Sequence, residues 1–358
     1  MTAQREPDEE LYVLGWDLGG AHVKAVLLDA SGVAINAMQV ACPLWRGMET
    51  LQQAVDRICA ALPHAAAFHA VTMTGELADI FSSREEGVHA LSAFMVERFG
   101  AESVCFYAGM EGFVTAAHVR RHAAAIASAN WRASAAFLAS EIESALLLDV
   151  GSTTSDVMLL YQGEVASSAV GDAERMQRDE LVYTGVVRTP LMAVAQRVPF
   201  QGEWQGVAAE HFATTADLYR LTGDLEACHD MAETADGAGK TLEESARRLA
   251  RMVGRDVADA RMEDWIQLAC AFKSRQLRIL QEAAERTLSR GLLQPDAPLV
   301  GAGAGRFMVQ ALARQMDRPY QDAAQWVQAV PEAQGWAVVC LPAYAVARLS
   351  MAQAGLLA

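Results

Sequence analysis

Two short stretches of the chain combine a carboxylate with a glycine turn, a pairing that suits phosphate chemistry. They are Asp17-Leu18-Gly19-Gly20 and Asp149-Val150-Gly151-Ser152-Thr153-Thr154. Each follows one apolar run and precedes another, which predicts a strand, a hairpin turn and a second strand. Glycine lets a ligand approach the backbone, and the amides of such a turn attract phosphate oxygens. The Asp at each strand end offers the oxygen ligands that Mg²⁺ prefers.

The repetition of this pattern is more specific than either copy, because a single Asp-x-Gly turn occurs in many ordinary hairpins. When the two stretches are aligned, Asp17 matches Asp149, whereas Lys24 falls on Asp156. These four side chains are the predicted catalytic residues, and the first two are also the predicted metal ligands. We leave open which of the three aspartates acts as a base and which binds metal.

A pair of carboxylates, Glu76 and Asp79, follows an apolar strand that is expected over residues 67–73. The chain runs through Thr74-Gly75 into an expected helix start at Glu76, which would place Glu76 and Asp79 on one face of the first turn. The pair would either compensate the helix dipole or contact a cation or a substrate amine.

Two further segments contribute predicted substrate contacts. Within residues 179–190, Tyr183 and Arg188 lie among residues that favour strands, and an arginine beside a phosphate turn suits recognition of an oxyanion. An exposed salt bridge is the alternative for Arg188. Near the end of the chain, Gly301-Ala302-Gly303-Ala304-Gly305 follows a short strand and precedes a helix, so its amides would lie at a helix N-terminus.

Two other motifs are rejected as sites. Residues 234–241 end in Gly-Lys-Thr, but Thr234 occupies the place of the first glycine of a phosphate-binding loop and no apolar strand precedes it. His211, Cys228 and His229 have a spacing that fits no helix face and no familiar zinc motif.

Composition limits the class of protein. The 358 residues suffice for two domains, and the net charge of −15 argues against a nucleic-acid partner. No pair among the six cysteines has Cys-x-x-Cys spacing, which favours reduced thiols and a cytoplasmic protein. The acidic N-terminus lacks the apolar core of a signal peptide, and no apolar run reaches membrane-spanning length, so no membrane partner is expected. A homodimer is left open.

The order of patterns along the chain predicts two α/β lobes. Residues 1–10 are expected to be a disordered lead-in, 11–143 a first lobe and 144–358 a second lobe carrying a helical insertion at about 205–290. The expected elements include a helical stretch over 113–142, a strand over 164–170, a strand over 336–341 and a helix over about 343–355.

The two phosphate turns together resemble those of the actin, sugar-kinase and Hsp70 superfamily. That resemblance implies two ribonuclease-H-like lobes of actin type with a phosphate ligand in a central cleft. It also implies that the turn Gly301–Gly305 forms a third wall of that cleft.

The motifs Trp16-Asp-Leu-Gly-Gly-Ala-His-Val-Lys24, Thr72-Met-Thr-Gly-Glu-Leu-Ala-Asp79 and Tyr183-Thr-Gly-Val-Val-Arg-Thr-Pro190 resemble a narrower family. This is the hydantoinase/oxoprolinase-related group of the tetrahydromethanopterin-linked one-carbon pathway. The resemblance implies a magnesium-dependent transferase of methanofuran or methylofuran biosynthesis. Such an enzyme would join a furanylmethyl diphosphate to a phenolic acceptor, form an aryl ether and release pyrophosphate without requiring ATP.

Two other interpretations remain. One is an ATP-dependent kinase or an oxoprolinase-like amidohydrolase, since most members of the superfamily use ATP. The other is a non-enzymatic nucleotide-sensing module. No adenine-pocket pattern is recognisable beyond the turn Gly301–Gly305, which favours the transferase.

Overall fold

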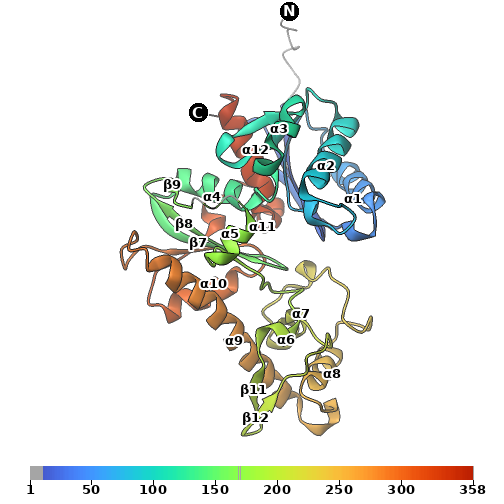
Figure 1. The fold of residues 1–358 in the computed structure, drawn as a ribbon, viewed down its shortest axis with the longest axis vertical. Helices are drawn as coiled ribbons and strands as arrows, with labels where there is room; N and C mark the ends of the chain where they lie inside the picture. Colours follow the sequence, from blue (N-terminus) through green and yellow to red (C-terminus); the bar gives the residue numbers. More distant parts are fainter. Residues whose placement is uncertain (1–10, 168, 170, 358) are drawn as a thin grey trace, which may run out of the picture. The chain divides into compact units, whose positions relative to one another are not determined.

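The computed structural model describes residues 11–167, 169 and 171–357, so the expected lead-in at 1–10 lies outside the described residues. The chain divides into two compact α/β units (Figure 1). The first unit comprises the residues up to Glu143, Gln162–Gly171 and the residues from Ala323 onward, and the second comprises Ser144–Tyr161 and Asp172–Asp322. The predicted α/β class is confirmed.

The first unit is built on a six-stranded sheet in the order β3-β2-β1-β4-β5-β6. Strand β1 (Val13–Leu18) pairs antiparallel with β2 (His22–Leu28) and parallel with β4 (Phe68–Met73). The other strands are β3 (Ala34–Ala41), β5 (Val104–Tyr107) and β6 (Phe113–Thr115), and β9 (Glu164–Val165) is a short strand of the same unit. The helices are α1 (Met48–Ala61), α2 (Arg84–Phe99), α3 (Val119–Ile126), α4 (Asn130–Glu141), α11 (Pro331–Val339) and α12 (Leu341–Gln353).

Alternate residues of β1 explain how helices cover both faces of this sheet. Leu14 and Trp16 belong to a buried cluster that includes side chains of α1 and α2. Gly15 points to the other face, where a Cβ atom would lie 1.9 Å from the carbonyl oxygen of Ala343 in α12. Only glycine therefore allows the backbone of α12, drawn red in Figure 1, to lie against the blue strand β1.

The second unit repeats the central strand pattern of the first. Its sheet has the order β10-β8-β7-β13-β14, with β7 (Ser144–Val150) antiparallel to β8 (Ser155–Tyr161) and parallel to β13 (Leu299–Ala302). A hairpin followed by parallel strands is thus present in both units. The other strands are β10 (Leu181–Val182), β14 (Tyr320–Asp322) and the separate hairpin β11 (Arg197–Phe200) and β12 (Glu203–Gly206).

Between β8 and β13 the chain carries several helices joined by loops and short strands. Its helices are α5 (Asp172–Gln177), α6 (Leu191–Val194), α7 (Thr215–Thr222), α8 (Leu242–Met252) and α9 (Met262–Leu288), and α10 (Arg306–Gln315) follows β13. In Figure 1 the hairpin β11–β12 lies beside the long helix α9, where Phe200 stacks on Trp265. Three of these helices, α7 to α9, fall within the expected insertion.

The structure corrects several expected elements. Residues 336–339 are the end of helix α11, which begins at Pro331, and Leu341 begins α12. The apolar run here is mostly buried, and periodicity alone cannot separate a buried strand from a buried helix. The stretch 113–142 contains β6 and two helices separated at Ser128, whose φ is +52°. The strand expected over 164–170 is limited to Glu164–Val165 among the described residues.

Both C-terminal helices contact the sheet of the first unit. Helix α11 contacts β3, and helix α12 contacts β1, β2 and β4. The expected assignment of 144–358 to one lobe therefore differs from the observed packing.

Among the described residues, no single helix is long and apolar enough to cross a membrane. The pair α11 and α12 is apolar enough only when taken together, and it bends by 102° at its junction.

Candidate functional site

The first phosphate turn joins β1 to β2 and places its two charged residues opposite each other. The amide of Gly19 donates to the carbonyl of His22 at 3.0 Å, which closes the turn. Asp17 pairs in register with Lys24 on one side and with Thr72 on the other. The Lys24 ammonium lies 3.5 Å from Asp17 Oδ2, and the Asp17 carboxylate is almost fully buried.

The predicted turn after β4 packs against this first turn. A Cβ atom on Gly75 would lie 3.0 Å from the carbonyl oxygen of Leu18, and the Thr74 amide donates to that oxygen at 3.0 Å. Gly20 also approaches Gly75 closely, with 4.0 Å between its ideal Cβ position and the Gly75 Cα. The structure therefore brings together Asp17, Lys24, Gly19, Gly20 and the Thr74–Gly75 turn within one unit.

The predicted pairing of Glu76 with Asp79 is wrong. Residues Gly75–Leu77 form a single 3₁₀ turn, the chain then extends at Ala78, and helix α2 begins only at Arg84, after the N-cap Ser83. Glu76 is buried and accepts a hydrogen bond from Ser128 Oγ at 2.6 Å, whereas Asp79 is exposed. The two carboxylates thus have different environments.

The second phosphate turn joins β7 to β8 with the same local geometry. The amide of Gly151 donates to the carbonyl of Thr154 at 2.9 Å, matching the bond that closes the first turn. The predicted segment 183–190 lies against it, because the amides of Val187 and Arg188 donate to the carbonyl of Ser152 at 3.1 and 2.8 Å.

Glycine is required where this segment meets the turn. A Cβ atom on Gly185 would lie 2.5 Å from the backbone of Ser152 and of Thr153. The Arg188 guanidinium lies 3.4 Å from Thr153 Oγ1, and burial lowers the pKa of Arg188. Tyr183, at the other end of the segment, is 55% exposed. Arg188 is therefore positioned beside the turn as the sequence predicts.

The glycine-rich turn after β13 forms a second wall around Asp149. Gly303 has φ +77°, and a Cβ atom there would lie 2.4 Å from Asp149 Oδ1. The amide of Gly305 donates to the carbonyl of Val150 at 2.8 Å. Because β13 is parallel to β7 as β4 is to β1, the Gly301–Gly305 turn occupies in the second unit the place of Thr74–Gly75 in the first.

Asp156 differs from the other predicted catalytic residues. It lies in register with Asp149, as Lys24 does with Asp17, but its carboxylate accepts a hydrogen bond from Arg175 Nη2 at 2.7 Å. Arg175 is buried, and the same nitrogen donates to the carbonyl of Glu180 at 2.9 Å. Asp156 is therefore one partner of an ion pair with a buried guanidinium.

Oxygen donors around Asp17 and Asp149 are of the kind that Mg²⁺ takes. Beside Asp17 in the sheet, Thr72 Oγ1 is buried and has no hydrogen-bond partner among the described residues. Asp149 is half-buried against the glycine turn. The residues present fit a magnesium ion held directly or through water.

Sequence reasoning missed three residues that shape these turns. They are Thr72 and Ser128 in the first unit and Arg175 in the second. Each lies beside a residue distant in sequence: Thr72 beside Asp17, Ser128 beside Glu76 and Arg175 beside Asp156. No local pattern marks such contacts, although the strand-end position of Thr72 was a usable signal.

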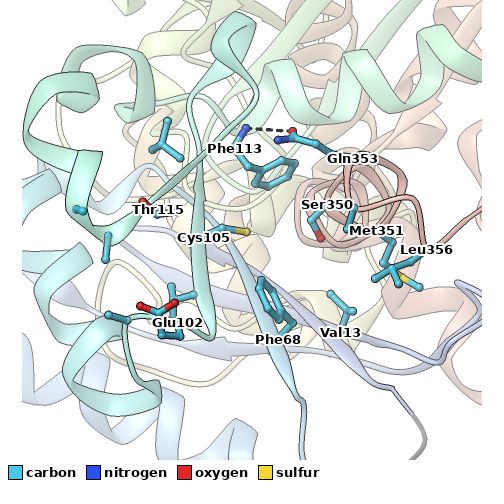
Figure 2. Close-up of a pocket in the computed structure, with 16 residues that line it drawn as sticks. Val13, Phe68, Glu102, Cys105, Phe113, Thr115, Ser350, Met351, Gln353 and Leu356 are labelled. Atoms are coloured by element: carbon cyan, nitrogen blue, oxygen red, sulfur yellow. Dashed lines mark hydrogen bonds between the residues drawn. The ribbon is translucent and has the colours of Figure 1, made fainter. Parts of the chain in front are cut away.

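A pocket of about 470 Å³ in the first unit contains none of the predicted site residues (Figure 2). Its wall includes Val13, Phe68 and Val104, which are the first residues of β1, β4 and β5. Asp17 lies near the other end of β1, so the pocket and the phosphate turn occupy opposite ends of the sheet. Gln353 of α12 accepts a hydrogen bond from the amide of Phe113 at its edge (Figure 2).

The duplicated strand pattern and its two phosphate turns define an α/β protein of the actin-like type. The chain belongs to the hydantoinase/oxoprolinase family, whose model matches residues 68–350. The family resemblance seen in the sequence is thereby confirmed. A solved structure of acetone carboxylase in its nucleotide-free form covers 95% of this chain and 70% of its own, with 11% identity and a TM-score of 0.56. That likeness concerns the fold alone.

Two named relatives are enzymes. The chain is 27% identical over 295 residues to the (4-{4-[2-(gamma-L-glutamylamino)ethyl]phenoxymethyl}furan-2-yl)methanamine synthase of Methanocaldococcus jannaschii, covering 82% of this chain and 87% of the relative. It is 28% identical over 127 residues to the synthase of the same name from Methanococcus vannielii, covering 36% of this chain and 57% of the relative.

Proposed function

We propose that this protein is a transferase of methanofuran or methylofuran biosynthesis. It would condense an (aminomethyl)furanylmethyl diphosphate with the phenol of a tyrosine- or tyramine-type acceptor, which can carry a glutamyl group. The similarity to the Methanocaldococcus jannaschii synthase over most of both chains carries this proposal. The name of that relative describes a phenol oxygen joined to a furan methylene, and this is the bond that the proposed reaction would form.

The reaction balances without a further reactant. The phenol oxygen attacks the furanylmethyl carbon, the bond from that carbon to the diphosphate oxygen breaks, and the phenol proton leaves. The products are the aryl ether, pyrophosphate and one proton. The furan ring stabilises positive charge on its methylene carbon, so the principal demand on the protein is to neutralise the departing diphosphate.

Each phosphate turn, within its own unit, carries groups of the kind that this task needs. In the first turn the amide of Gly20 would donate to phosphate oxygens, and in the second the amides of Ser152, Thr153 and Thr154 would do so, because the amides of Gly19 and Gly151 already close the turns. Lys24 would add a point charge at the first turn, and Arg188, placed beside Thr153, would add a cation at the second. In the second unit the turn Gly301–Gly305 would add the amides of Gly303 and Ala304, since the amide of Gly305 donates to Val150.

We propose that Asp17 or Asp149 binds Mg²⁺. When bound, the ion would neutralise charge on the diphosphate as it departs. Asp17 also fixes the position of Lys24 through their ion pair, so the ammonium is held at the turn before the substrate arrives. Such preorganisation removes the need to order the side chain during the reaction.

The phenol has an ordinary pKa of about 10, so a base must accept its proton as the carbon–oxygen bond forms. Asp156 is already engaged by Arg175 and is less available for this role. We therefore propose that the proton passes to whichever of Asp17 and Asp149 does not bind the ion directly. Two exposed residues are the proposed contacts to the rest of the substrates, Asp79 to the amine and Tyr183 to the acceptor.

Ligand-dependent melting tests the phosphate specificity of the site. A ligand present at a hundred times its Kd adds about 2.7 kcal/mol of stability, equivalent to a few degrees in Tm. With magnesium present, pyrophosphate should raise the Tm, and matched concentrations of ADP or ATP should do no better. A large shift with ATP or ADP and none with pyrophosphate would contradict the proposal and support the kinase or amidohydrolase interpretation.

A further inference from the structure

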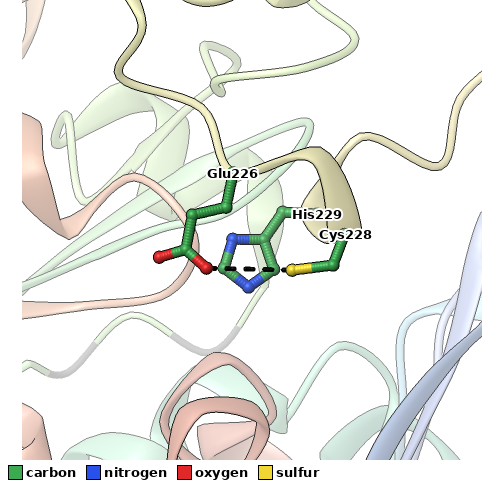
Figure 3. A group of neighbouring side chains, drawn as sticks. All are labelled: Glu226, Cys228 and His229. Atoms are coloured by element: carbon green, nitrogen blue, oxygen red, sulfur yellow. Dashed lines mark hydrogen bonds between the residues drawn. The ribbon is translucent and has the colours of Figure 1, made fainter.

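Three potential metal ligands gather on one short turn of the second unit. Glu226, Cys228 and His229 lie on or beside the 3₁₀ turn Ala227–His229, and their ligand atoms are all within 4.8 Å of one another. Figure 3 shows the carboxylate, the imidazole and the thiol on the same side of the turn. Cys228 Sγ lies 3.8 Å from Glu226 Oε2.

This group of ligands differs from the group His211, Cys228 and His229, which the sequence spacing argues against. His211 is not among the gathered ligands, and Glu226 takes the third place beside Cys228 and His229. The carboxylate and the thiol are exposed while the imidazole is buried. The carboxylate and the thiol are therefore open to a cation from solvent, and the buried imidazole lies within 4.8 Å of both.

The loop that carries these ligands is fixed at both ends by ion pairs. Asp224 accepts from Lys273 Nζ at 2.6 Å, and Asp230 accepts from Arg220 Nε at 2.6 Å and from Lys240 Nζ at 3.1 Å. Because the loop is already anchored, the entropy lost on bringing three ligands to one ion is reduced.

We propose that Glu226, Cys228 and His229 bind one Zn²⁺ ion. Zinc takes thiolate, imidazole and carboxylate ligands, whereas Mg²⁺ takes oxygen. In the ion-free protein a Cys228 thiolate would repel the adjacent Glu226 carboxylate, and a shared cation converts that repulsion into two attractions. Three protein ligands leave one tetrahedral position for water.

The positive charge of Arg306 opposes the binding of a cation at this site. Arg306, the first residue of α10, lies near enough for its charge to act on His229. Its guanidinium is itself 3.2 Å from Asp322 Oδ2, which offsets part of that charge.

Cobalt titration of the full-length, tag-free protein tests the site without any substrate. Co²⁺ should give the near-ultraviolet thiolate-to-cobalt charge-transfer band at one equivalent, and zinc should displace it. Cys228→Ser should abolish the band and weaken zinc binding by at least about tenfold, since loss even of an outer partner of a metal ligand costs that much. Cys270→Ser is the matched control, because Cys270 is also an exposed thiol but belongs to no such cluster among the described residues.

The outcome is independent of the transferase proposal. Asp149→Asn should leave the cobalt band unchanged, whatever it does to catalysis. A band that is absent from the wild type, or that survives Cys228→Ser and disappears in Cys270→Ser, would overturn the zinc site. Equal zinc affinity in the wild type and in Cys228→Ser would also overturn it.

Discussion

The ammonium of Lys24 lies 3.5 Å from the carboxylate of Asp17, across the antiparallel pair formed by β1 and β2. The same position in the second unit, across from Asp149, holds Asp156, which is paired with Arg175 instead. The two turns share a backbone geometry but not a charge pattern. The first offers a cation beside its aspartate, while the second keeps its own cation, Arg188, on the neighbouring segment.

Replacing Lys24 tests the first of these cations. Lys24→Met should raise the KM for the furanylmethyl diphosphate by about tenfold or more, because a hydrogen bond to a charged group contributes about 1.5–3 kcal/mol. The KM for the phenolic acceptor should change little. Lys24→Arg, which keeps the charge, should recover part of the loss, and steady-state kinetics in each substrate is the measurement. A larger defect in the acceptor KM would place Lys24 elsewhere in the site.

The Asp156–Arg175 pair should act mainly on stability. Asp156→Asn leaves a buried guanidinium without its counter-charge, and breaking a buried pair in this way costs about 3 kcal/mol. Urea unfolding should show that loss. Asp29→Asn is a control, because Asp29 accepts its hydrogen bonds in an exposed turn. An Asp156→Asn protein of unchanged stability but without activity would restore Asp156 as a catalytic residue.

The close approach of Gly303 to Asp149 can be tested by a matched pair of glycines. Gly303 and Gly291 both have positive φ, at +77° and +70°, so an alanine at either position carries a similar backbone penalty of about 1 kcal/mol. Only at Gly303 would the new methyl group meet other atoms, including Asp149 Oδ1 at 2.4 Å, since no atom lies within 4 Å at Gly291. Gly303→Ala should lower the free energy of unfolding more than Gly291→Ala. Equal losses would contradict the packing described.

His69 should make stability depend on pH. Its Nδ1 accepts a hydrogen bond from Trp16 Nε1 at 3.1 Å, and burial lowers the pKa of its imidazole to about 4. The unfolded chain, with a His pKa of about 6.5, binds more protons between these values, so stability falls as pH drops from about 6.5 to 4. The contribution is complete above pH 6.5, and its loss is on the order of 3 kcal/mol.

Denaturant unfolding at several pH values measures this effect. His69→Leu should be less stable than the wild type at pH 7.5, because the Trp16 donor loses its acceptor, but its stability should fall less between pH 6.5 and 4. His64→Gln is the control, since His64 is exposed. Identical pH slopes for the wild type and His69→Leu would show that His69 does not titrate as described.

The parts of the fold that follow from local sequence could be predicted. Both hairpins, both phosphate turns and the glycine turn at 301–305 depend on apolar runs interrupted by Asp and Gly, and these patterns operate within a few residues. The packing of α12 on β1 depends on Gly15 meeting Ala343, two residues from opposite ends of the chain. The partnership of Asp156 with Arg175 likewise has no local signal, so part of the site could not be predicted.

The segment after β4 shows that a correctly predicted turn does not fix the structure that follows it. The strand and the turn at Thr74–Gly75 follow the prediction, but the helical start expected at Glu76 is a single 3₁₀ turn, and α2 begins at Arg84, where the hydroxyl of Ser83 accepts from the amide of Glu86. A capping serine is a stronger start signal than an acidic residue after glycine. The cap at Ser83 begins α2 after both Glu76 and Asp79, so neither carboxylate lies on that helix.

The transferase assay addresses the central proposal most directly. The protein is incubated with magnesium, (aminomethyl)furanylmethyl diphosphate and a tyramine-type acceptor labelled with ¹⁸O in its phenol, without ATP. We expect one pyrophosphate for each ether formed, with the label retained in the ether as detected by mass spectrometry. Asp17→Asn and Asp149→Asn should each reduce turnover by about 100-fold or more. No ether with either tyrosine- or tyramine-type acceptors, or an ether formed only when ATP is consumed, would contradict the proposed function.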